Sequence, residues 1–149
     1  MFRGRSDHTI DEKGRIILPV RLRDVLNKKN HSTIMLTMLD SCLVAYPPDE
    51  WDVLERKFLE HPDGGTEMAK NFKRSFIGSA EDCPLDKQGR ILVPPTLRGG
   101  ARLEKNIVIV GLINHFEIWN AAMFTQNMQE GQDPSKAEAL RNFRRDVGI

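Results

Sequence analysis

The chain has 149 residues, of which 40% are hydrophobic and 29% are charged, proportions typical of a globular protein and not of a disordered one. No apolar run approaches the roughly 20 residues of a membrane-spanning helix, so we expect no membrane partner. The net charge is +1, but residues 1–30 carry +4 (8 − 4) and residues 49–63 carry −4 (2 − 6). This segregation suits a positive face that meets a polyanion, or simply two solvated surfaces.

The first predicted elements are two short strands over residues 6–10 and 15–18, joined as a hairpin. Asp11 and Gly14 occupy the first and fourth positions of the connection, which suits a type I turn closed by a left-handed glycine. Pro19 then ends the second strand. The next elements are a short helix over 20–26 and a second hairpin, with strands over 33–38 and 43–46 that turn at Asp40-Ser41.

Two helices are predicted next, as a connector. Asp49 suits the N-cap of a helix that runs to about Glu60, and Thr66 suits the N-cap of a second helix that runs to about Ile77. The second helix has an apolar face, which we assign to packing within or between chains and not to a ligand site. Its residues are Met68, Ala69, Phe72, Phe76 and Ile77.

The chain then repeats itself. Residues 11–23 and 86–98 share seven of thirteen positions at a constant offset of 75, where average residue usage gives about one match by chance. The second copy therefore has the same order of turn, strand, short helix and hairpin. After it, Asn120 suits the N-cap of a short helix, and residues 135–145 form another, which carries Arg141, Arg144 and Arg145.

The resulting organisation is two modules, 5–51 and 80–124, with a helical connector over 52–79 and a C-terminal helical tail over 125–149. Because a module of about 45 residues buries little surface alone, we expect the two copies to interleave their strands around one core. The N-terminal residues lack the apolar segment of a secretory signal, so we expect a cytoplasmic protein. Cys42 and Cys83 are then expected to be partly buried free thiols.

The feature common to both copies that carries chemistry is Asp-x-x-Gly-Arg. In so tight a turn the carboxylate of Asp11 can accept backbone N–H groups and also orient the guanidinium of Arg15. An oriented guanidinium suits bidentate recognition of a guanine edge, and Lys13 at the tip suits a phosphate. The alternative is a surface ion pair worth under about 1 kcal/mol. The occurrence of the Asp-x-x-Gly-Arg motif in both copies favours a nucleic-acid contact over this alternative.

These motifs resemble the MraZ family. Asp11-x-x-x-Arg15 and Asp86-x-x-x-Arg90 are each followed by an apolar triplet and a proline, and the chain also contains Met1-Phe2-Arg3-Gly4 and Phe116-Glu117-Ile118-Trp119 in the same order. The resemblance covers residues 1–124. It implies an α+β fold, a duplicated AbrB-like swapped-hairpin β-barrel, with both halves supplied by one chain.

The resemblance also implies a function. The protein would be a repressor of the division and cell-wall gene cluster, including its own promoter, and would read short G-rich direct repeats in double-stranded DNA. It would assemble as a homo-oligomeric ring associated with the nucleoid. The residues expected to contact DNA are Arg15, Arg90, Lys13, Lys87, Gly14 and Gly89, with Asp11 and Asp86 orienting the loops. The second loop departs from the pattern, because Gln88 stands in place of the tip lysine.

Other classes of function fit less well. The four histidines occur singly, no Cys/His cluster has metal-ligand spacing, and no phosphate-binding glycine loop is present, so we expect no cofactor, no metal, no small-molecule substrate and no enzyme activity. A carboxylate paired with arginine is also a poor general acid or base near neutral pH. The remaining alternative is an oligomeric protein-interaction or antitoxin-like module of the same fold.

Overall fold

The computed structural model describes all 149 residues. The first half contains β1 (Arg5–Thr9), β2 (Arg15–Ile17), α1 (Val20–Lys28), β3 (Thr33–Leu39), β4 (Cys42–Tyr46), α2 (Pro48–Glu60) and α3 (Glu67–Phe76). The second half contains β5 (Glu81–Pro84), β6 (Arg90–Leu92), α4 (Pro95–Gly100), β7 (Asn106–Gly111), β8 (Phe116–Asn120), α5 (Ala121–Glu130), a 3-10 turn (Pro134–Lys136) and α6 (Ala137–Val147). None of the helices combines the length and apolar character needed to cross a bilayer.

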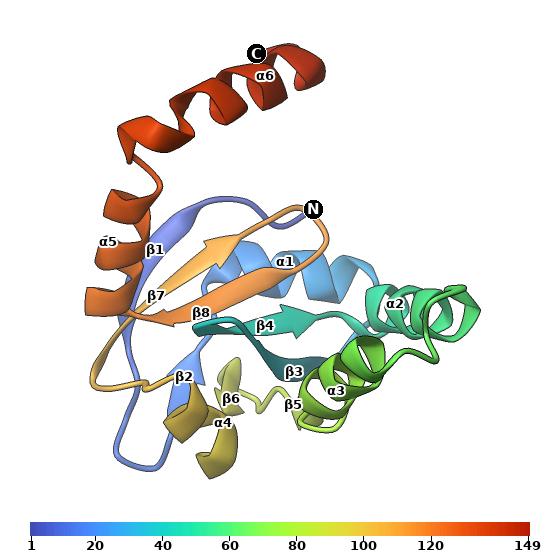
Figure 1. The fold of residues 1–149 in the computed structure, drawn as a ribbon. Helices are drawn as coiled ribbons and strands as arrows, with labels where there is room; N and C mark the ends of the chain where they lie inside the picture. The colour runs from blue at the N-terminus through green and yellow to red at the C-terminus, as the bar shows by residue number, and fades with distance from the viewer.

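The strands form a six-stranded antiparallel sheet and a separate two-stranded ribbon (Figure 1). The sheet order is β1-β7-β8-β4-β3-β5, and the ribbon consists of β2 and β6. Strand β1 from the first repeat pairs with β7 from the second, and β5 from the second repeat pairs with β3 from the first. The predicted α+β class and the duplicated, strand-exchanging arrangement are therefore confirmed.

The predicted local hairpin of residues 6–10 with 15–18 is wrong. The turn between them forms, with Gly14 at φ +88° and its N–H donating to the carbonyl of Asp11 (2.9 Å). However, β1 and β2 diverge after it and pair with different strands of the other repeat. A lone two-stranded hairpin is marginal in water, whereas the exchange buries Ile16 against Ile91. Since both repeats share one core, the module limits given above stay a prediction.

The large sheet is buried on both faces. Side chains on one face of the sheet, such as Ile34 and Ile109, join a core of 20 residues with α1, α4 and the ribbon. Side chains on the opposite face, such as Val44 and Val108, join an aromatic-rich cluster under α2, α3 and α5. The period-2 alternation of strand side chains explains how one sheet serves both layers.

Two of the three predicted helix caps are confirmed. The side chains of Thr66 and Asn120 accept hydrogen bonds from the N–H groups of Ala69 and Met123, both at 3.2 Å. Asp49 is not a cap, because α2 already begins at Pro48, after Pro47. Its carboxylate lies instead 2.9 Å from Lys29 Nζ and 3.0 Å from His31 Nε2.

One buried polar contact joins α3 to the sheet. The hydroxyl of Thr37 donates to the carbonyl of Phe76 (2.5 Å), and Thr37 is fully buried. We predict that Thr37→Val lowers the free energy of unfolding by about 1–3 kcal/mol, because the carbonyl then loses its partner in an apolar layer. Urea denaturation measures the change. Thr33→Val on the same strand removes an exposed bond to Asp82 and should cost under about 0.5 kcal/mol; equal costs would contradict the prediction.

Candidate nucleic-acid interface

The two-stranded ribbon presents the repeated motif to solvent. Ile16 and Ile91 lie opposite each other at its centre and point into the core. Their neighbours point outward, and Arg15 lies opposite Leu92 while Ile17 lies opposite Arg90. The ribbon is thus close to two-fold symmetric, with one arginine near each end and an apolar side chain beside it. Leu92 is 58% exposed and Ile17 is 55% exposed.

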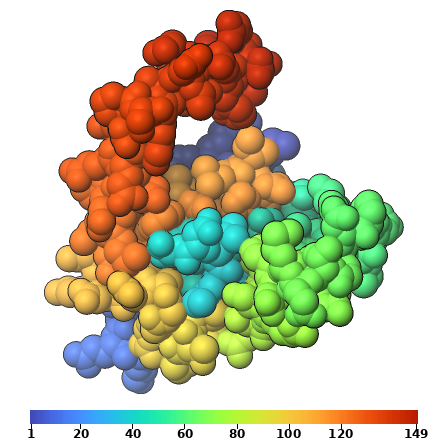
Figure 2. Space-filling model, in the orientation of Figure 1, coloured from blue at the N-terminus to red at the C-terminus, as the bar shows by residue number.

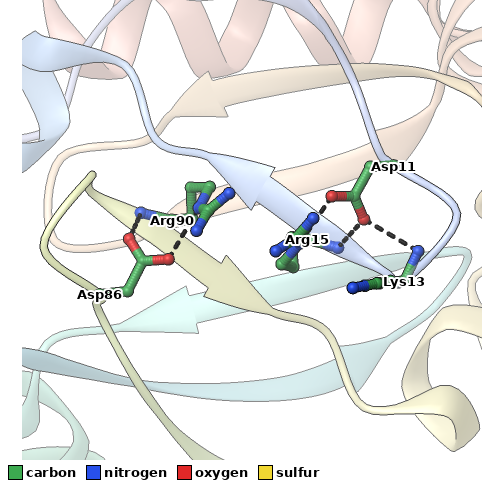
Figure 3. Close-up of polar contacts among 5 residues, drawn as sticks. All are labelled: Asp11, Lys13, Arg15, Asp86 and Arg90. Atoms are coloured by element: carbon green, nitrogen blue, oxygen red, sulfur yellow. Dashed lines mark hydrogen bonds and ion pairs between the residues drawn. The ribbon is translucent and has the colours of Figure 1, made fainter.

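The first arginine is held by the turn that precedes it. Asp11 Oδ1 accepts the backbone N–H groups of Lys13 (3.0 Å) and Arg15 (2.9 Å), and Asp11 Oδ2 accepts from Arg15 Nε (2.7 Å). One carboxylate therefore closes the turn and orients the guanidinium at the same time (Figure 3).

The second turn reproduces this geometry. Asp86 Oδ1 accepts the N–H groups of Gln88 (2.9 Å) and Arg90 (2.9 Å), and Asp86 Oδ2 accepts from Arg90 Nε (2.7 Å). Gln88 takes the position of Lys13, as the repeat indicated, and Lys87 is exposed one residue earlier. The two Asp–Arg pairs lie at opposite ends of the ribbon (Figure 3).

Each turn favours the charged form of its carboxylate. The backbone N–H of Arg15 is the largest influence and lowers the pKa of Asp11; desolvation opposes it, and the Arg15 guanidinium lowers the pKa further, and Arg90 does the same for Asp86. The arginine side chains are 34% and 29% exposed. Neither uses a terminal guanidinium nitrogen for a hydrogen bond within the chain. Those nitrogens remain available to a ligand with paired acceptors.

Each turn is braced by the other repeat. The carbonyl of Gly14 accepts the N–H of Val93 (2.8 Å), and the side chain of Arg98 lies over the glycine. A Cβ at Gly14 would stand 2.8 Å from Arg98 Nη1 and 3.2 Å from the carbonyl of Val93. Together with φ +88°, this crowding explains why the position requires glycine.

The second turn is braced in the same way. The carbonyl of Gly89 accepts the N–H of Leu18 (3.0 Å), and Arg23 packs over Gly89 while its Nε donates to the carbonyl of Leu18 (3.0 Å). Four arginines and two lysines therefore surround the ribbon, against three acids in the two turns: Arg15, Arg23, Arg90, Arg98, Lys13 and Lys87, against Asp11, Glu12 and Asp86. This end of the molecule is suited to a polyanion.

The structure brings all eight predicted site residues together at the ribbon and its turns, although their contact with DNA stays a prediction. Four further residues at this surface were not predicted from the sequence: Arg23, Arg98, Ile17 and Leu92. A signal existed for the arginines, because Arg23 and Arg98 are identical positions of the repeat. Ile17 and Leu92 occupy the same position of the repeat, but each lies within a continuous apolar triplet, so the sequence does not indicate that their side chains are exposed. No group of three or more His, Cys, Asp or Glu side chains is arranged to hold a metal ion.

Comparison with known proteins identifies the family. A family model described as "MraZ protein, putative antitoxin-like" matches twice, over residues 1–71 and 76–146. A protein of Desulforapulum autotrophicum named transcriptional regulator MraZ is 41% identical over 149 residues, which is all of both chains. Proteins of the same name from Shewanella frigidimarina and Desulfitobacterium hafniense are 41% and 44% identical, over 96% of this chain and 99% of each relative.

Both the family model and these relatives extend over nearly the whole chain, and so include the ribbon, both turns and the sheet that supports them. The chain belongs to the MraZ family, whose relatives above are named transcriptional regulators.

Proposed function

We propose that this protein regulates transcription by inserting its two-stranded ribbon into the major groove of double-stranded DNA. The observation that carries the proposal is the pair of Asp-held arginines on the outer face of one ribbon. The major groove, about 12 Å wide, admits a two-stranded β-ribbon. The braced turns reach the groove already ordered, so binding costs little conformational entropy.

The outer face of the ribbon offers two kinds of base contact. Arg15 and Arg90 suit the O6 and N7 acceptors of guanine, at about 1–3 kcal/mol of discrimination per bidentate pair. Ile17 and Leu92 lie directly opposite these arginines on the ribbon and suit the methyl group of thymine. Lys13, Lys87, Arg23 and Arg98 flank the face, where phosphates would lie.

The finer proposal is repression of the division and cell-wall gene cluster, including the gene's own promoter, through short G-rich direct repeats. A single ribbon touches few bases, so binding is strong only if several copies act together, which can raise avidity by about 10²–10⁴. Direct repeats favour subunits in one orientation, as in a head-to-tail ring, whereas a two-fold dimer favours palindromes. Such a protein would act in the cytoplasm, on the nucleoid.

The alternative is an oligomeric protein-interaction or antitoxin-like module in which the ribbon binds an acidic protein. The antitoxin-like description of the family model supports this alternative. Binding to duplex DNA distinguishes the two. A ribbon that reads DNA prefers promoter sequence over random duplex, and this preference depends on its arginines.

We predict that Arg15→Ala abolishes preference for the DNA upstream of the protein's own gene, because one guanine-reading group is lost. The far-ultraviolet circular dichroism and oligomer size should not change, since the side chain is outside the core. Fluorescence anisotropy with promoter and random duplexes measures the preference. Arg56→Ala on α2 makes the same charge change away from the ribbon and should bind normally. Wild-type affinity of Arg15→Ala for the promoter would refute the contact.

A second prediction separates phosphate contacts from base contacts. Lys13→Ala should weaken binding to promoter and random duplexes alike and reduce the slope of log K against log salt by about one unit. Lys136→Ala, in the C-terminal tail, serves as the charge-matched control and should keep the wild-type slope. Equal slopes for wild type and Lys13→Ala would remove Lys13 from the phosphate contacts.

A third prediction tests the apolar contacts. Because the 5-methyl group distinguishes thymine from uracil, a uracil-substituted promoter duplex should bind the wild-type protein several-fold more weakly. Ile17→Ser combined with Leu92→Ser should weaken binding to the thymine duplex and remove most of the difference between the two duplexes. Both side chains are more than half exposed, so the fold should persist. An undiminished thymine preference in the double variant would exclude these two residues from methyl contacts.

A further inference from the structure

The C-terminal helix α6 has no packing partner within the chain. None of its 11 residues is buried, and α6 stands away from the body as an arm that extends from α5 (Figures 1 and 2). The helix is nevertheless well terminated, because Gly148 adopts φ +84° and the N–H of Ile149 donates to the carbonyl of Arg144 (2.8 Å). This six-to-one bond is the Schellman form of a helix end.

One side of α6 is apolar. Leu140, Phe143 and Val147 are spaced i, i+3, i+7, and they are 50%, 63% and 54% exposed. A helix shorter than about 12–15 residues is marginal in water without tertiary contacts. The spacing is also that of the anchors by which an amphipathic helix enters an apolar groove. The helix therefore carries the features of a segment that packs against another surface.

An apolar groove lies between α2 and α3. It has a volume of about 460 Å³, and five of its eight lining residues are hydrophobic: Leu54, Phe58, Met68, Ala69 and Phe72. Met68 is 77% exposed and Phe72 is 44% exposed. Stacked aromatic rings hold α2 and α3 together beneath the groove: Phe58, Phe72 and Phe76 lie with ring centroids 5.4–5.9 Å apart.

The two elements differ only slightly in net charge. Helices α2 and α3 together carry six acids and five bases (5 − 6 = −1), and α6 carries three arginines and two acids (3 − 2 = +1). The apolar stripe of α6 is bordered by Arg144, one residue after Phe143. Apolar contact would therefore supply the stabilisation, since neither surface carries a net charge large enough to oppose the other.

The groove and the helix do not meet within one chain. Helix α5, from which α6 extends, packs against β7 and β8, whereas α2 and α3 pack against β3, toward the other edge of the sheet (Figure 1). We propose that α6 of one copy docks in the α2–α3 groove of a second copy. The contact joins two different surfaces of the same chain, so it links copies head to tail and closes a ring where the rotation permits.

This inference rests on the self-association proposed above and assigns it a pair of surfaces. Phe143→Glu should reduce the assembly, measured by light scattering after size exclusion, to the 17.0 kDa of one chain. Met68→Glu in the groove should have the same effect. Asn142→Glu adds the same charge outside the apolar stripe and should leave the assembly intact. Phe143→Glu and Met68→Glu both replace exposed side chains, so the circular dichroism spectrum should remain that of the wild type.

Cross-linking decides between a second copy and the chain's own groove. Met68→Cys in a tagged chain and Phe143→Cys in an untagged chain should give a mixed covalent dimer with a short bismaleimide. The native thiols should not react, because burial raises the pKa of Cys83 to about 12 and also raises the pKa of Cys42. A chain carrying both substitutions should give a ladder of oligomers; a circularised single chain would overturn the proposal.

The outcomes separate the two proposals. If the wild type remains a single chain at all concentrations, self-association and this docking both fail. If the wild type assembles and Phe143→Glu assembles equally well, only the docking of α6 fails. DNA reading by the ribbon is tested independently by Arg15→Ala, whose substitution lies outside both surfaces.

Discussion

The pairing of β2 with β6 is the interaction on which the rest of the molecule depends. Each strand has only three residues, and they come from different repeats. Their pairing buries Ile16 and Ile91 in the main core and places one arginine near each end of the outer face. A slip of one residue would turn the arginines inward and the isoleucines outward, so burial of this pair sets both the core and the interface.

This dependence explains the division of roles among the repeated residues. The carboxylates of the turns hold the arginines, the glycines allow the backbones to approach the opposite repeat, and Arg23 and Arg98 cover those glycines. Each turn is therefore supported by the repeat to which it does not belong. A contact surface organised in this way loses little freedom on binding, and preorganisation of this kind is how a small surface gains affinity.

The surfaces proposed for recognition and for assembly lie on separate parts of the chain. The ribbon closes one side of the core, whereas the α2–α3 groove and the α6 arm lie on elements outside the repeated strands. Such separation would let the number of linked copies set avidity while the ribbon sets sequence preference. The duplication supplies two arginines on one rigid ribbon, and head-to-tail linkage would present further ribbons in the same orientation.

The sequence by itself determined the features that arise from neighbours along the chain. The turn with Gly14, the cap at Thr66 and the Asp11–Arg15 pair all follow from residues within about five positions of one another, where local hydrogen bonding decides the geometry. The repeat follows from comparing the two halves of the sequence directly. The pairing of strands was decided only by the tertiary structure. The local pattern of two strands around a tight turn favours a hairpin, but β1 and β2 pair instead with strands more than 70 residues away, because only the exchange closes one core from two small repeats. The same packing leaves Ile17 and the apolar side of α6 exposed. A local sequence pattern does not predict this exposure, because it depends on contacts between distant parts of the chain.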